Sequence, residues 1–460
     1  MVNSEGNTEV DVVVIGLGPG GEAVATQLAV GGLEVVGVDQ RLVGGECPYY
    51  GCVPSKMMIR GADLIAEGRR IPEVSGASTV EPDWTPVADR IRDEATSDWD
   101  DQIAIDRLVD AGVRFVRGTG RLAGERTVVV GDETFVCRKG VVLNTGTEPA
   151  VPPIDGLADT PYWTNREAIR ATEVPGSLIV IGGGAIGLEL TQVFSRFGVD
   201  TTVIEVAPRI LAPEEPESSK LLGEVFGREG IQVLADVKIS SVSYADGQFT
   251  VDVDGQSLHA DKLLVAAGRR PNLSDIGLDT VGLDPSARVI ETDERMAVAD
   301  VEGLWAIGDI TGKGAFTHVS MYQSAVAARA ILGEDGPPAD YRAVPHVTFT
   351  DPEVGSVGMT EQHARDSGLT VRIGLTDLTA STRGWIHKTG NDGLIKLVED
   401  ADRGVLVGAT AVGPSGGEVL SALAVAVHAE VPTSTLESMI YAYPTFHRAI
   451  ESAVKDLAAS

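Results

Sequence analysis

The feature that most constrains the fold is a succession of apolar run, glycine-rich turn, helical stretch and second apolar run near the start of the chain. Residues 11–15 form the first run and Gly16–Gly21 (Gly-Leu-Gly-Pro-Gly-Gly) form the turn. A helical stretch at 22–30 leads to the second run, 34–38, which ends in Asp39. Short apolar runs of this kind indicate strands buried on both faces, as in a parallel sheet. The segment therefore predicts a βαβ unit.

The same order of elements recurs in the middle of the chain. Residues 177–181 lead into Gly182–Gly187 (Gly-Gly-Gly-Ala-Ile-Gly), then a helical stretch at 188–197 and a strand at 201–204 that ends in Glu205. Two such units predict an α/β fold with two Rossmann-like domains.

The two copies also share the spacing between glycine turn and acid. Gly21 to Asp39 and Gly187 to Glu205 are both 18 positions. Glycines allow the backbone to turn and approach a pyrophosphate at a helix N-terminus, and the acid accepts hydrogen bonds from an adenosine ribose. Two bound dinucleotides are therefore predicted. The candidate binding residues are Gly16, Gly18, Gly20, Gly21 and Asp39 in the first copy and Gly182, Gly184, Gly187 and Glu205 in the second.

Charge and hydropathy narrow the possible partners. The formal net charge is −30, from 37 basic and 67 acidic residues, and the acids are scattered along the chain. Nucleic-acid and anionic-membrane binding need a positive surface, so neither is expected. No apolar stretch reaches the roughly 18 residues of a membrane span, and residues 1–10 lack a basic and apolar leader. A cytoplasmic location is expected.

Turn-rich segments at 146–156 and 267–272 mark two crossings between domains. After the second crossing, Leu304–Asp309 resembles a strand ending in Gly-Asp, and 318–332 is compatible with a helix. From about Val344 the pattern changes to strands near 346–349 and 394–398 that alternate with helical stretches at 417–429 and 435–439. The predicted domains are a first nucleotide domain at 1–150 and 272–343, a second at 151–271, and a C-terminal α+β domain at 344–460.

Two of the three cysteines, Cys47 and Cys52, lie just after the acid that ends the first unit. Zinc sites usually need a second Cys/His cluster, and Cys137 falls in an apparent strand at 134–137. Metal binding remains the poorer alternative, and no metal site is assigned. One turn of helix could bring the two sulfurs together near the first nucleotide. This placement suggests a redox-active disulfide beside a flavin.

With these segments in view, the chain resembles the FAD-dependent pyridine nucleotide-disulfide oxidoreductases, which include dihydrolipoamide dehydrogenase, glutathione reductase and mercuric reductase. The resemblance covers nearly the whole chain. Besides the two nucleotide units it rests on Gly44–Lys56, Gly268–Asn272, Gly308-Asp309 and Pro345–Gly358. It implies FAD in the first unit, NAD(P)H in the second, and a C-terminal interface domain. The expected assembly is a homodimer whose active site is shared across the interface.

The resemblance also assigns roles to the residues around the cysteines. Cys52 would be the thiolate that contacts the flavin, and Cys47 the interchange thiol that meets the substrate. Lys56 would lie near flavin N5 and pair with Glu189, and its charge would favour the Cys52 thiolate. Without the motif, Lys56 and Glu189 would be read as ordinary solvated charges.

For the cofactors, Asp309 would hold the ribityl chain of FAD, and the backbone following His318 would approach the flavin ring. Gly45, Gly146 and Gly268 complete the candidate cofactor-binding residues. Glu205 can bind the ribose hydroxyls and would repel a 2′-phosphate, which favours NADH. Arg209, four residues later, is a possible phosphate partner and keeps NADPH as an alternative.

The last segment departs from the family pattern. Disulfide-reducing relatives carry His-Pro-Thr-x-x-Glu, whereas this chain has Tyr443 at the His position and Arg448 at the Glu position. A phenol with a pKa near 10 is a poor proton shuttle at neutral pH, and general acid–base catalysis contributes about 10²- to 10⁴-fold. Efficient lipoamide or glutathione disulfide reduction is therefore not expected. His447 could in principle replace the missing base, but it lies one helical turn beyond the expected position, so an ordinary surface or interface histidine is favoured. Arg448 and Glu451 could pair at i, i+3.

Several acceptors stay open. The resemblance to mercuric reductase, with a Tyr at the corresponding place, favours a metal or electrophile as acceptor. Against it, residues 455–460 carry no cysteine pair, and an N-terminal metal-binding module is not expected. Glu46 replaces a Thr that helps to hold FAD in the family. Tyr49 and Tyr50 could pack in the core or shape a pocket for a quinone.

Two competing functions remain: a dihydrolipoamide dehydrogenase with an altered acid–base residue, and a non-enzymatic flavoprotein. The function expected is electron transfer from NADH through FAD and the Cys47/Cys52 disulfide to a small-molecule acceptor.

Overall fold

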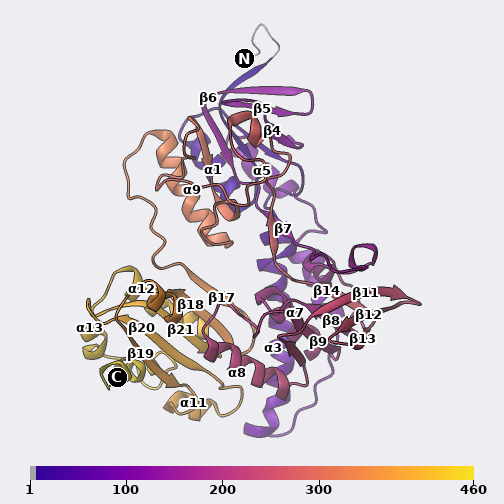
Figure 1. The fold of residues 1–460 in the computed structure, drawn as a ribbon, viewed down its shortest axis with the longest axis vertical. Helices are drawn as coiled ribbons and strands as arrows, with labels where there is room; N and C mark the ends of the chain where they lie inside the picture. Colours follow the sequence, from indigo (N-terminus) through magenta and orange to yellow (C-terminus); the bar gives the residue numbers. More distant parts are fainter. Residues whose placement is uncertain (1–6, 460) are drawn as a thin grey trace. The chain divides into compact units, whose positions relative to one another are not determined.

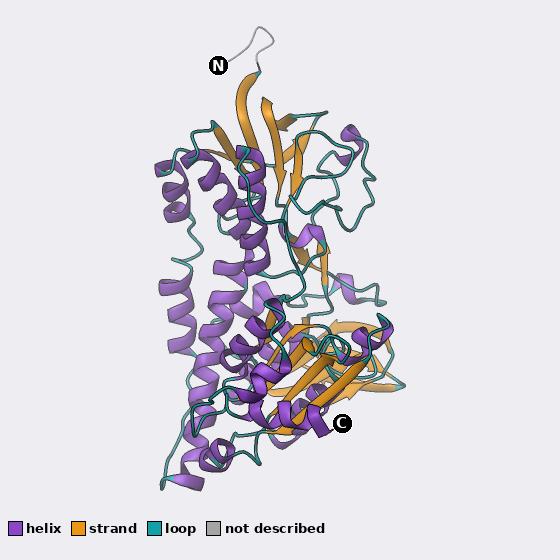
Figure 2. Cartoon of the chain, turned by 90° about the vertical axis from the view of Figure 1, so that its left-hand side faces the viewer, coloured by secondary structure: helices purple, strands orange, loops and turns teal. Residues whose placement is uncertain are grey.

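The computed structural model describes residues 7–459 and divides the chain into two units (Figures 1 and 2). The first unit comprises the residues up to 54, 90–150 and 269–341, and it holds the first βαβ unit. The second comprises 55–89, 151–268 and the residues from 342 on, so it holds both the second βαβ unit and the C-terminal sheet. The boundaries given above for three domains stay a prediction.

The first βαβ unit is confirmed as strand β1 (Thr8–Ile15), helix α1 (Pro19–Val30) and strand β2 (Val35–Asp39). β1 pairs in parallel with β2 and with β6 (Glu133–Leu143). Successive valines of β1 enter different hydrophobic clusters, because neighbouring side chains of a strand point to opposite faces. The strand is therefore buried on both sides, as its uninterrupted apolar run predicts.

The sheet has the order β3-β2-β1-β6-β5-β4, and β16 also pairs with β6. Helix α9 (Thr317–Leu332) packs beside α1 (Figure 1). The remaining strands of this sheet are β3 (Arg114–Arg117), β4 (Gly120–Leu122), β5 (Thr127–Val130) and β16 (Leu304–Ala306).

The second βαβ unit is also confirmed, as β8 (Ser177–Ile181), α7 (Ala185–Arg196) and β9 (Asp200–Glu205). Its parallel sheet has the order β10-β9-β8-β14. An antiparallel sheet β11-β12-β13, which the sequence analysis does not predict, follows β10 along the chain. The elements are β10 (Gln232–Ala235), β11 (Ile239–Ala245), β12 (Gln248–Val253), β13 (Gln256–Ala260), β14 (Lys262–Val265) and helix α8 (Pro216–Arg228).

The two predicted crossings pair with each other. Strand β7 (Thr147–Pro149) lies in the first crossing and β15 (Arg269–Pro271) in the second, and they form an antiparallel two-stranded sheet. Each crossing is therefore held by backbone hydrogen bonds instead of being an irregular linker.

The C-terminal domain is an antiparallel sheet with the order β17-β18-β21-β20-β19. Its central strands, β20 (Leu394–Asp400) and β21 (Val405–Gly413), are buried along their whole length. Helices α12 (Gly416–His428) and α14 (Ala449–Ala459) pack on this sheet and share one hydrophobic cluster with it. The other elements are β17 (Pro345–Thr348), β18 (Glu353–Gly358), β19 (Val371–Asp377), α10 (Glu361–Asp366), α11 (Thr382–His387) and α13 (Thr433–Ser438).

Helix α3 (Cys52–Val74) is the longest described helix and follows the short helix α2 (Glu46–Tyr50). The remaining helices are α4 (Thr85–Arg90), the π-helix Ile91–Ala95, α5 (Gln102–Asp110), α6 (Asn165–Ile169) and the 3₁₀ turns Leu157–Asp159, Leu278–Val281 and Gly308–Thr311.

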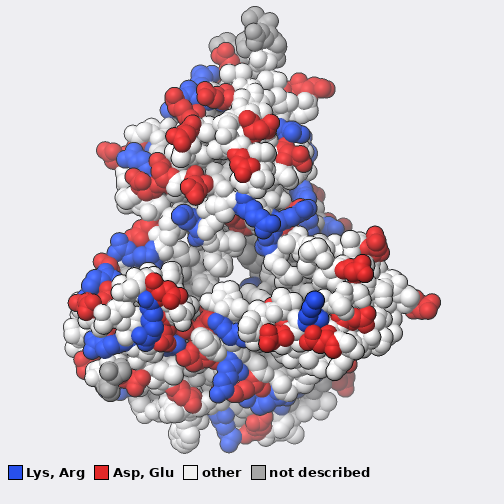
Figure 3. All heavy atoms as spheres, in the orientation of Figure 1, with Lys and Arg blue, Asp and Glu red and all other residues white. Residues whose placement is uncertain are grey.

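Acidic and basic side chains are interspersed on the face of the molecule shown in Figure 3. Between residues 7 and 459, no helix combines the length and the apolar character needed to cross a membrane.

Candidate functional site

The first glycine of each turn has a backbone conformation that only glycine tolerates well. Gly16 has φ +91° and Gly182 has φ +114°. A Cβ at Gly16 would lie 2.3 Å from the carbonyl oxygen of Asn144, and one at Gly182 would lie 2.4 Å from that of Ala266. Both turns therefore require glycine for backbone reasons, as the fingerprint predicts.

The last glycine of each turn allows close packing of helix against turn. A Cβ at Gly21 would lie 2.0 Å from the Gly16 carbonyl oxygen, and one at Gly187 would lie 2.1 Å from that of Gly182. At Gly20 the added Cβ would instead meet Ser320 Oγ of α9 at 2.0 Å. Gly20 therefore lets α1 and α9 pack closely, which explains this residue without a ligand.

The two acids make equivalent hydrogen bonds. Asp39 accepts from the backbone N–H of Leu17 and of Arg41, both at 2.7 Å. Glu205 accepts from the backbone N–H of Gly183 at 2.6 Å and of Ala207 at 2.7 Å. Each acid thus ties its glycine turn to the end of the second strand, and burial raises the pKa of the Asp39 carboxyl above its ordinary value.

The N-termini of α1 and α7 suit a phosphate-bearing ligand. Gly18 and Gly184 are the N-cap residues of these helices, and neither provides a side chain to cap the first N–H groups. A Cβ at Gly184 or at Gly146 would meet nothing within 4 Å. In the first unit, Thr145 Oγ1 is buried without a hydrogen-bond partner among the described residues. Unsatisfied donors at a helix N-terminus and an orphaned hydroxyl fit a dinucleotide such as FAD.

Asp309 lies in a polar chain that connects segments distant in sequence. It accepts a hydrogen bond from Thr147 Oγ1 at 2.6 Å, and Thr147 Oγ1 in turn accepts from Arg269 Nε at 2.7 Å. Glu46, which replaces the Thr of the family pattern, lies 3.7 Å from the Arg269 guanidinium. The negative charge of Glu46 thus has a cationic neighbour within the same unit. His318, near the start of α9, stacks on Phe316 with ring centroids 5.3 Å apart.

Cys47 and Cys52 lie near disulfide distance. The expectation that one helical turn joins them is wrong, because Cys47 lies in α2, Cys52 begins α3, and Gly51 between them leaves helical geometry with φ −136° and ψ −117°. Cys52 Sγ lies 3.5 Å from Thr317 Oγ1, the first residue of α9. Cys137 is buried in β6, where burial raises the pKa of its thiol to about 12. The pair is therefore the reactive-thiol candidate and Cys137 is not.

The predicted pairing of Lys56 with Glu189 is present, with Lys56 Nζ 2.8 Å from Glu189 Oε2. Glu189 is buried on α7, whereas the Lys56 side chain is 35% exposed. The second oxygen, Glu189 Oε1, accepts from the backbone N–H of Phe349 at 2.8 Å, and the Lys56 ammonium lies 4.5 Å from the centroid of the Phe349 ring. Sequence reasoning missed Phe349.

Two further residues of α7 hold the segment after Phe349. Gln192 donates to the backbone carbonyl of Asp351 at 2.9 Å and accepts from its N–H at 2.8 Å. Arg196 lies 2.7 Å from the Asp351 carboxylate. Burial raises the pKa of the Asp351 carboxyl, but Arg196 and Arg70 outweigh burial and hold that pKa below its ordinary value. The available sequence signal is polar side chains at i, i+3 and i+7 on a helix that is otherwise apolar.

At the C-terminal segment, Tyr443 and Arg448 contact each other. The Arg448 guanidinium carbon lies 5.2 Å from the centroid of the Tyr443 ring, and Arg448 also pairs with Glu451 at 3.0 Å, as predicted. Tyr443 is 64% exposed in the single chain. His447 lies beside the Tyr441 ring, with centroids 5.4 Å apart. The two positions that depart from the family pattern thus still form a pair, of a different chemical kind.

Tyr49 and Arg209, whose roles the sequence leaves open, both have defined surroundings in the structure. Tyr49 is 6% exposed and burial raises its pKa to about 12, which supports the packing interpretation of this residue. Arg209 donates to the carbonyls of Leu211 and Ala212 and to Ser219 Oγ. Its guanidinium is therefore occupied by its own loop and by α8.

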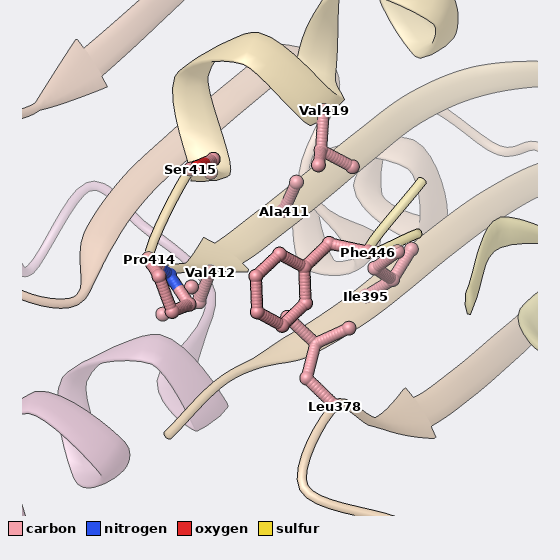
Figure 4. A pocket seen from close by; sticks show the side chains of 10 residues that line it. Leu378, Ile395, Ala411, Val412, Pro414, Ser415, Val419 and Phe446 are labelled. Carbon is pink, nitrogen blue, oxygen red and sulfur yellow. The ribbon is translucent and has the colours of Figure 1, made fainter. Parts of the chain in front are cut away.

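Outside the nucleotide turns and the cysteine segment, the described part of the chain offers a small pocket and no cluster of metal-ligating side chains. Figure 4 shows a small apolar pocket in the C-terminal domain, where the Phe446 ring lies among Leu378, Ala411 and Val412. Within residues 7–459, no group of three or more His, Cys, Asp or Glu side chains is arranged to hold a metal ion.

Comparison with known proteins agrees with this arrangement. The family model described as pyridine nucleotide-disulphide oxidoreductase matches residues 10–329, and that of the family's dimerisation domain matches residues 344–454. Dihydrolipoyl dehydrogenase of Halobacterium salinarum is 33% identical over 475 residues, covering 99% of this chain and 98% of the relative. Mercuric reductase of Acidithiobacillus ferrooxidans is 33% identical over 456 residues, covering 97% of this chain and 82% of the relative.

Two solved structures share the fold. LpdA from Mycobacterium tuberculosis has a TM-score of 0.84 at 25% identity, covering 98% of this chain and 99% of its own. The HOCl-induced flavoprotein disulfide reductase RclA from Escherichia coli has a TM-score of 0.84 at 24% identity, covering 97% and 99%. The named activities of these proteins differ, so the acceptor is not identified by them. The matches to both family models and the paired cysteines nevertheless agree on one class: the chain belongs to the FAD-dependent pyridine nucleotide-disulphide oxidoreductases.

Proposed function

We propose that this protein transfers electrons from NADH, through FAD and the Cys47–Cys52 disulfide, to an electrophilic acceptor such as a metal ion. The observation that carries the proposal is the cysteine pair, near disulfide distance where α2 ends and α3 begins. Thiols held this close can alternate between a disulfide and a dithiol without a large backbone movement.

The nucleotide assignment follows from the two glycine turns. Gly16, Gly18, Gly21 and Asp39 would hold the ADP half of FAD, and Asp309 the ribityl chain. Gly182, Gly184, Gly187 and Glu205 would hold the coenzyme. NADH is favoured because Glu205 presents a carboxylate where a 2′-phosphate would lie, and because the Arg209 guanidinium is engaged by Leu211, Ala212 and Ser219.

The electron balance involves one hydride. FAD held at the Gly16–Gly21 turn would supply two-electron chemistry, so that the hydride of NADH, two electrons and a proton, could reach the Cys47–Cys52 disulfide as an electron pair. With one further proton from solvent, the Cys47–Cys52 bond opens to two thiols. A Lys56 ammonium held by Glu189 would favour the thiolate form of Cys52. Cys52 precedes Lys56 by four residues on α3.

The acceptor end lacks an imidazole–carboxylate pair. Tyr443 and Arg448 occupy the two positions and contact each other, and in general a phenol or a guanidinium is a poorer proton shuttle at neutral pH than an imidazole. A dialkyl disulfide such as lipoamide needs a proton for its leaving thiolate, whereas a metal ion bound between thiolates does not. This difference favours a metal or electrophile over lipoamide. A quinone that reacts directly with reduced flavin is the second candidate, because it also needs no base at this position.

We further propose a homodimer with the active site shared across the interface. The match to the dimerisation domain suggests this assembly. In the single chain Ile440 is 96% exposed and Tyr443 64% exposed, on one segment of the C-terminal domain. A second copy covering this segment would bury apolar surface that otherwise faces water.

Substitution of Cys47 by Ser tests the route of the electrons. With NADH as donor, we expect C47S to lose reduction of metal ions and disulfides by more than about 100-fold, while the flavin is still reduced. Cys137→Ala, which removes the buried thiol, should keep the wild-type rates. If C47S retains turnover with the acceptor that the wild type prefers, the thiol route is wrong and the quinone route replaces it.

An anaerobic NADH titration separates the same alternatives in the unmodified protein. A long-wavelength thiolate-to-flavin absorbance at two electrons per flavin would support the disulfide route. Bleaching of the flavin without this absorbance would contradict it.

A further inference from the structure

Phe349 touches both members of the Lys56–Glu189 pair. Its backbone N–H donates to Glu189 Oε1 at 2.8 Å, and its ring centroid lies 4.5 Å from Lys56 Nζ. Lys56 donates to the other oxygen, Glu189 Oε2, at 2.8 Å. The three residues form a closed triangle, in which the ammonium lies between a carboxylate oxygen and the face of an aromatic ring.

The Phe349 ring restricts the position of the Lys56 ammonium more than the ion pair with Glu189 does alone. A lysine ammonium is a compact charge on a flexible four-carbon stem, and one ion pair on a side chain that is 35% exposed restricts it weakly. An aromatic face attracts the same cation from a second direction. The two contacts together restrict the ammonium to one place.

The segment that carries the ring is itself held in place. Gln192 forms two hydrogen bonds with the backbone of Asp351, and the buried Arg196 pairs with the Asp351 carboxylate at 2.7 Å. Arg70 pairs with the same carboxylate at 2.7 Å. Because Glu189, Gln192 and Arg196 all belong to α7, one helix positions both the carboxylate and the aromatic side of the triangle.

We propose that Phe349 is a positioning residue for Lys56, which holds the ammonium against the Glu189 carboxylate and thereby sets how strongly its charge favours the thiolate of Cys52, four residues earlier on α3. The inference rests on the proposed function, in which Lys56 favours the Cys52 thiolate. It adds a contribution from the C-terminal domain that neither the cysteine segment nor the nucleotide units contain.

The test measures the apparent pKa of the thiolate in the anaerobic holoenzyme, reduced by two electrons, from the pH dependence of the long-wavelength thiolate-to-flavin absorbance. Phe349→Leu removes the ring but keeps the backbone N–H to Glu189. We expect the apparent thiolate pKa to rise by up to about 0.5 units, because an ammonium that is less restricted stabilises the thiolate less strongly relative to the neutral thiol. Alkylation of the reduced dithiol by iodoacetamide, followed against pH, provides an independent readout.

Phe349→Tyr keeps the aromatic face and should restore the wild-type value. Phe115→Leu is the matched control, because it removes a phenylalanine whose ring lies 4.7 Å from the Arg117 guanidinium and touches neither Lys56 nor Glu189. If F349L fails to fold, Phe349→Met, with a side chain of similar volume, takes its place and should give the same rise.

Two results overturn the inference. One is a thiolate pKa in F349L or F349M within about 0.2 units of the wild type, since the position of the Lys56 ammonium would then not depend on the ring in a way that reaches Cys52. The other is a shift in F349Y equal to that in F349L, because the ring face would then not matter.

Lys56→Met separates failure of this inference from failure of the proposed function. If the wild type shows no thiolate absorbance, or if K56M leaves the thiolate pKa unchanged, the role proposed for Lys56 is wrong, and with it the inference about Phe349. If K56M raises the thiolate pKa but F349L and F349M do not, the role of Lys56 stands and only the inference about Phe349 is overturned.

Discussion

Asp39 and Glu205 each serve a structural purpose besides any contact with a ribose. Each carboxylate accepts two backbone N–H groups, one from its glycine turn and one from the residue two positions on. A carboxylate that is fixed by two donors presents its remaining lone pairs in one direction. Ribose recognition and order of the glycine turn are therefore coupled in the same side chain.

This coupling gives a prediction for Glu205. Glu205→Ala should lower kcat/KM for NADH by about 10- to 100-fold, because hydrogen bonds to a charged group contribute roughly 1.5 to 3 kcal/mol each. The value for NADPH should fall less, since the substitution also removes a repulsive charge. Steady-state kinetics with both coenzymes measures the ratio. Glu224→Ala, which changes an exposed acid on α8, should leave both values unchanged. An unchanged NADH value in E205A would contradict the ribose assignment.

A second prediction concerns the pair Tyr443 and Arg448. Replacing both, as Y443H/R448E, restores the imidazole–carboxylate combination of disulfide-reducing relatives. We expect lipoamide reduction to rise by about 10²-fold or more, within the range typical of general acid–base catalysis. Tyr443→His alone should give a smaller gain, because no carboxylate orients its ring. A double variant as inactive toward lipoamide as the wild type would show that another feature excludes this substrate.

At the scale of elements, α7 connects the second nucleotide unit with the C-terminal domain. Its buried residues Glu189, Gln192 and Arg196 face the segment that follows β17 and hold it by backbone and carboxylate contacts. The buried Arg196 pairs with the Asp351 carboxylate and also with Glu229 and Asp63, so loss of the Asp351 charge weakens this cluster without leaving Arg196 unpaired. We therefore expect this connection to respond to acid.

The direction in which the stability of the fold changes with pH follows from the Asp351 pKa, which the neighbouring arginines hold below the ordinary value. Because the pKa is lower in the folded state, the carboxylate stabilises the fold above its unfolded pKa of about 3.9, and this contribution disappears as the pH falls through the folded pKa. Asp351→Asn should cost about 1.5 to 3 kcal/mol at pH 7, and less near pH 3, where the contribution of the carboxylate has begun to fall. Thermal unfolding at both pH values measures this difference. Asp366→Asn, at an exposed position of α10, is the control; an equal cost of D351N at both pH values would contradict the ion-pair account.

The sheet β11-β12-β13 has turn signals in its sequence that predict hairpins. Its strands are joined by Asp246-Gly247 and by Asp254-Gly255, and all four residues have positive φ. An Asp-Gly pair between alternating strands is a strong hairpin signal, because both central residues of the turn need positive φ. This sheet was therefore predictable from local signals, as the two βαβ units were.

At the scale of the whole molecule, the large acidic net charge affects how strongly two copies of the chain associate. A net charge of −30 on each copy opposes contact between two copies, and salt screens this repulsion. The exposed apolar side chains around Ile440 would supply the compensating burial. The proposed dimer should therefore strengthen as the ionic strength rises.

Ile440→Glu tests this assembly. It places a charge where apolar surface would be buried, so we expect the dimer dissociation constant to rise by more than about tenfold, the equivalent of 1.4 kcal/mol. Sedimentation velocity at low and high salt measures it. Val30→Glu makes a comparable change at an exposed position of α1, 76% exposed, and should leave the dimer intact. A dimer equally stable in I440E and the wild type would place the interface elsewhere.

Local patterns along the chain specify the two βαβ units and place Cys47 close to Cys52, whereas the antiparallel pairing of the two crossings is seen only in the structure. The local patterns depend on backbone conformation and short spacing, such as the positive φ of Gly16 and Gly182, which only a few residue types satisfy. Contacts between side chains that are distant in sequence depend on tertiary packing. The contacts of Phe349 with Lys56 and Glu189 depend on which surfaces pack together, and one sequence carries no local signal for that choice.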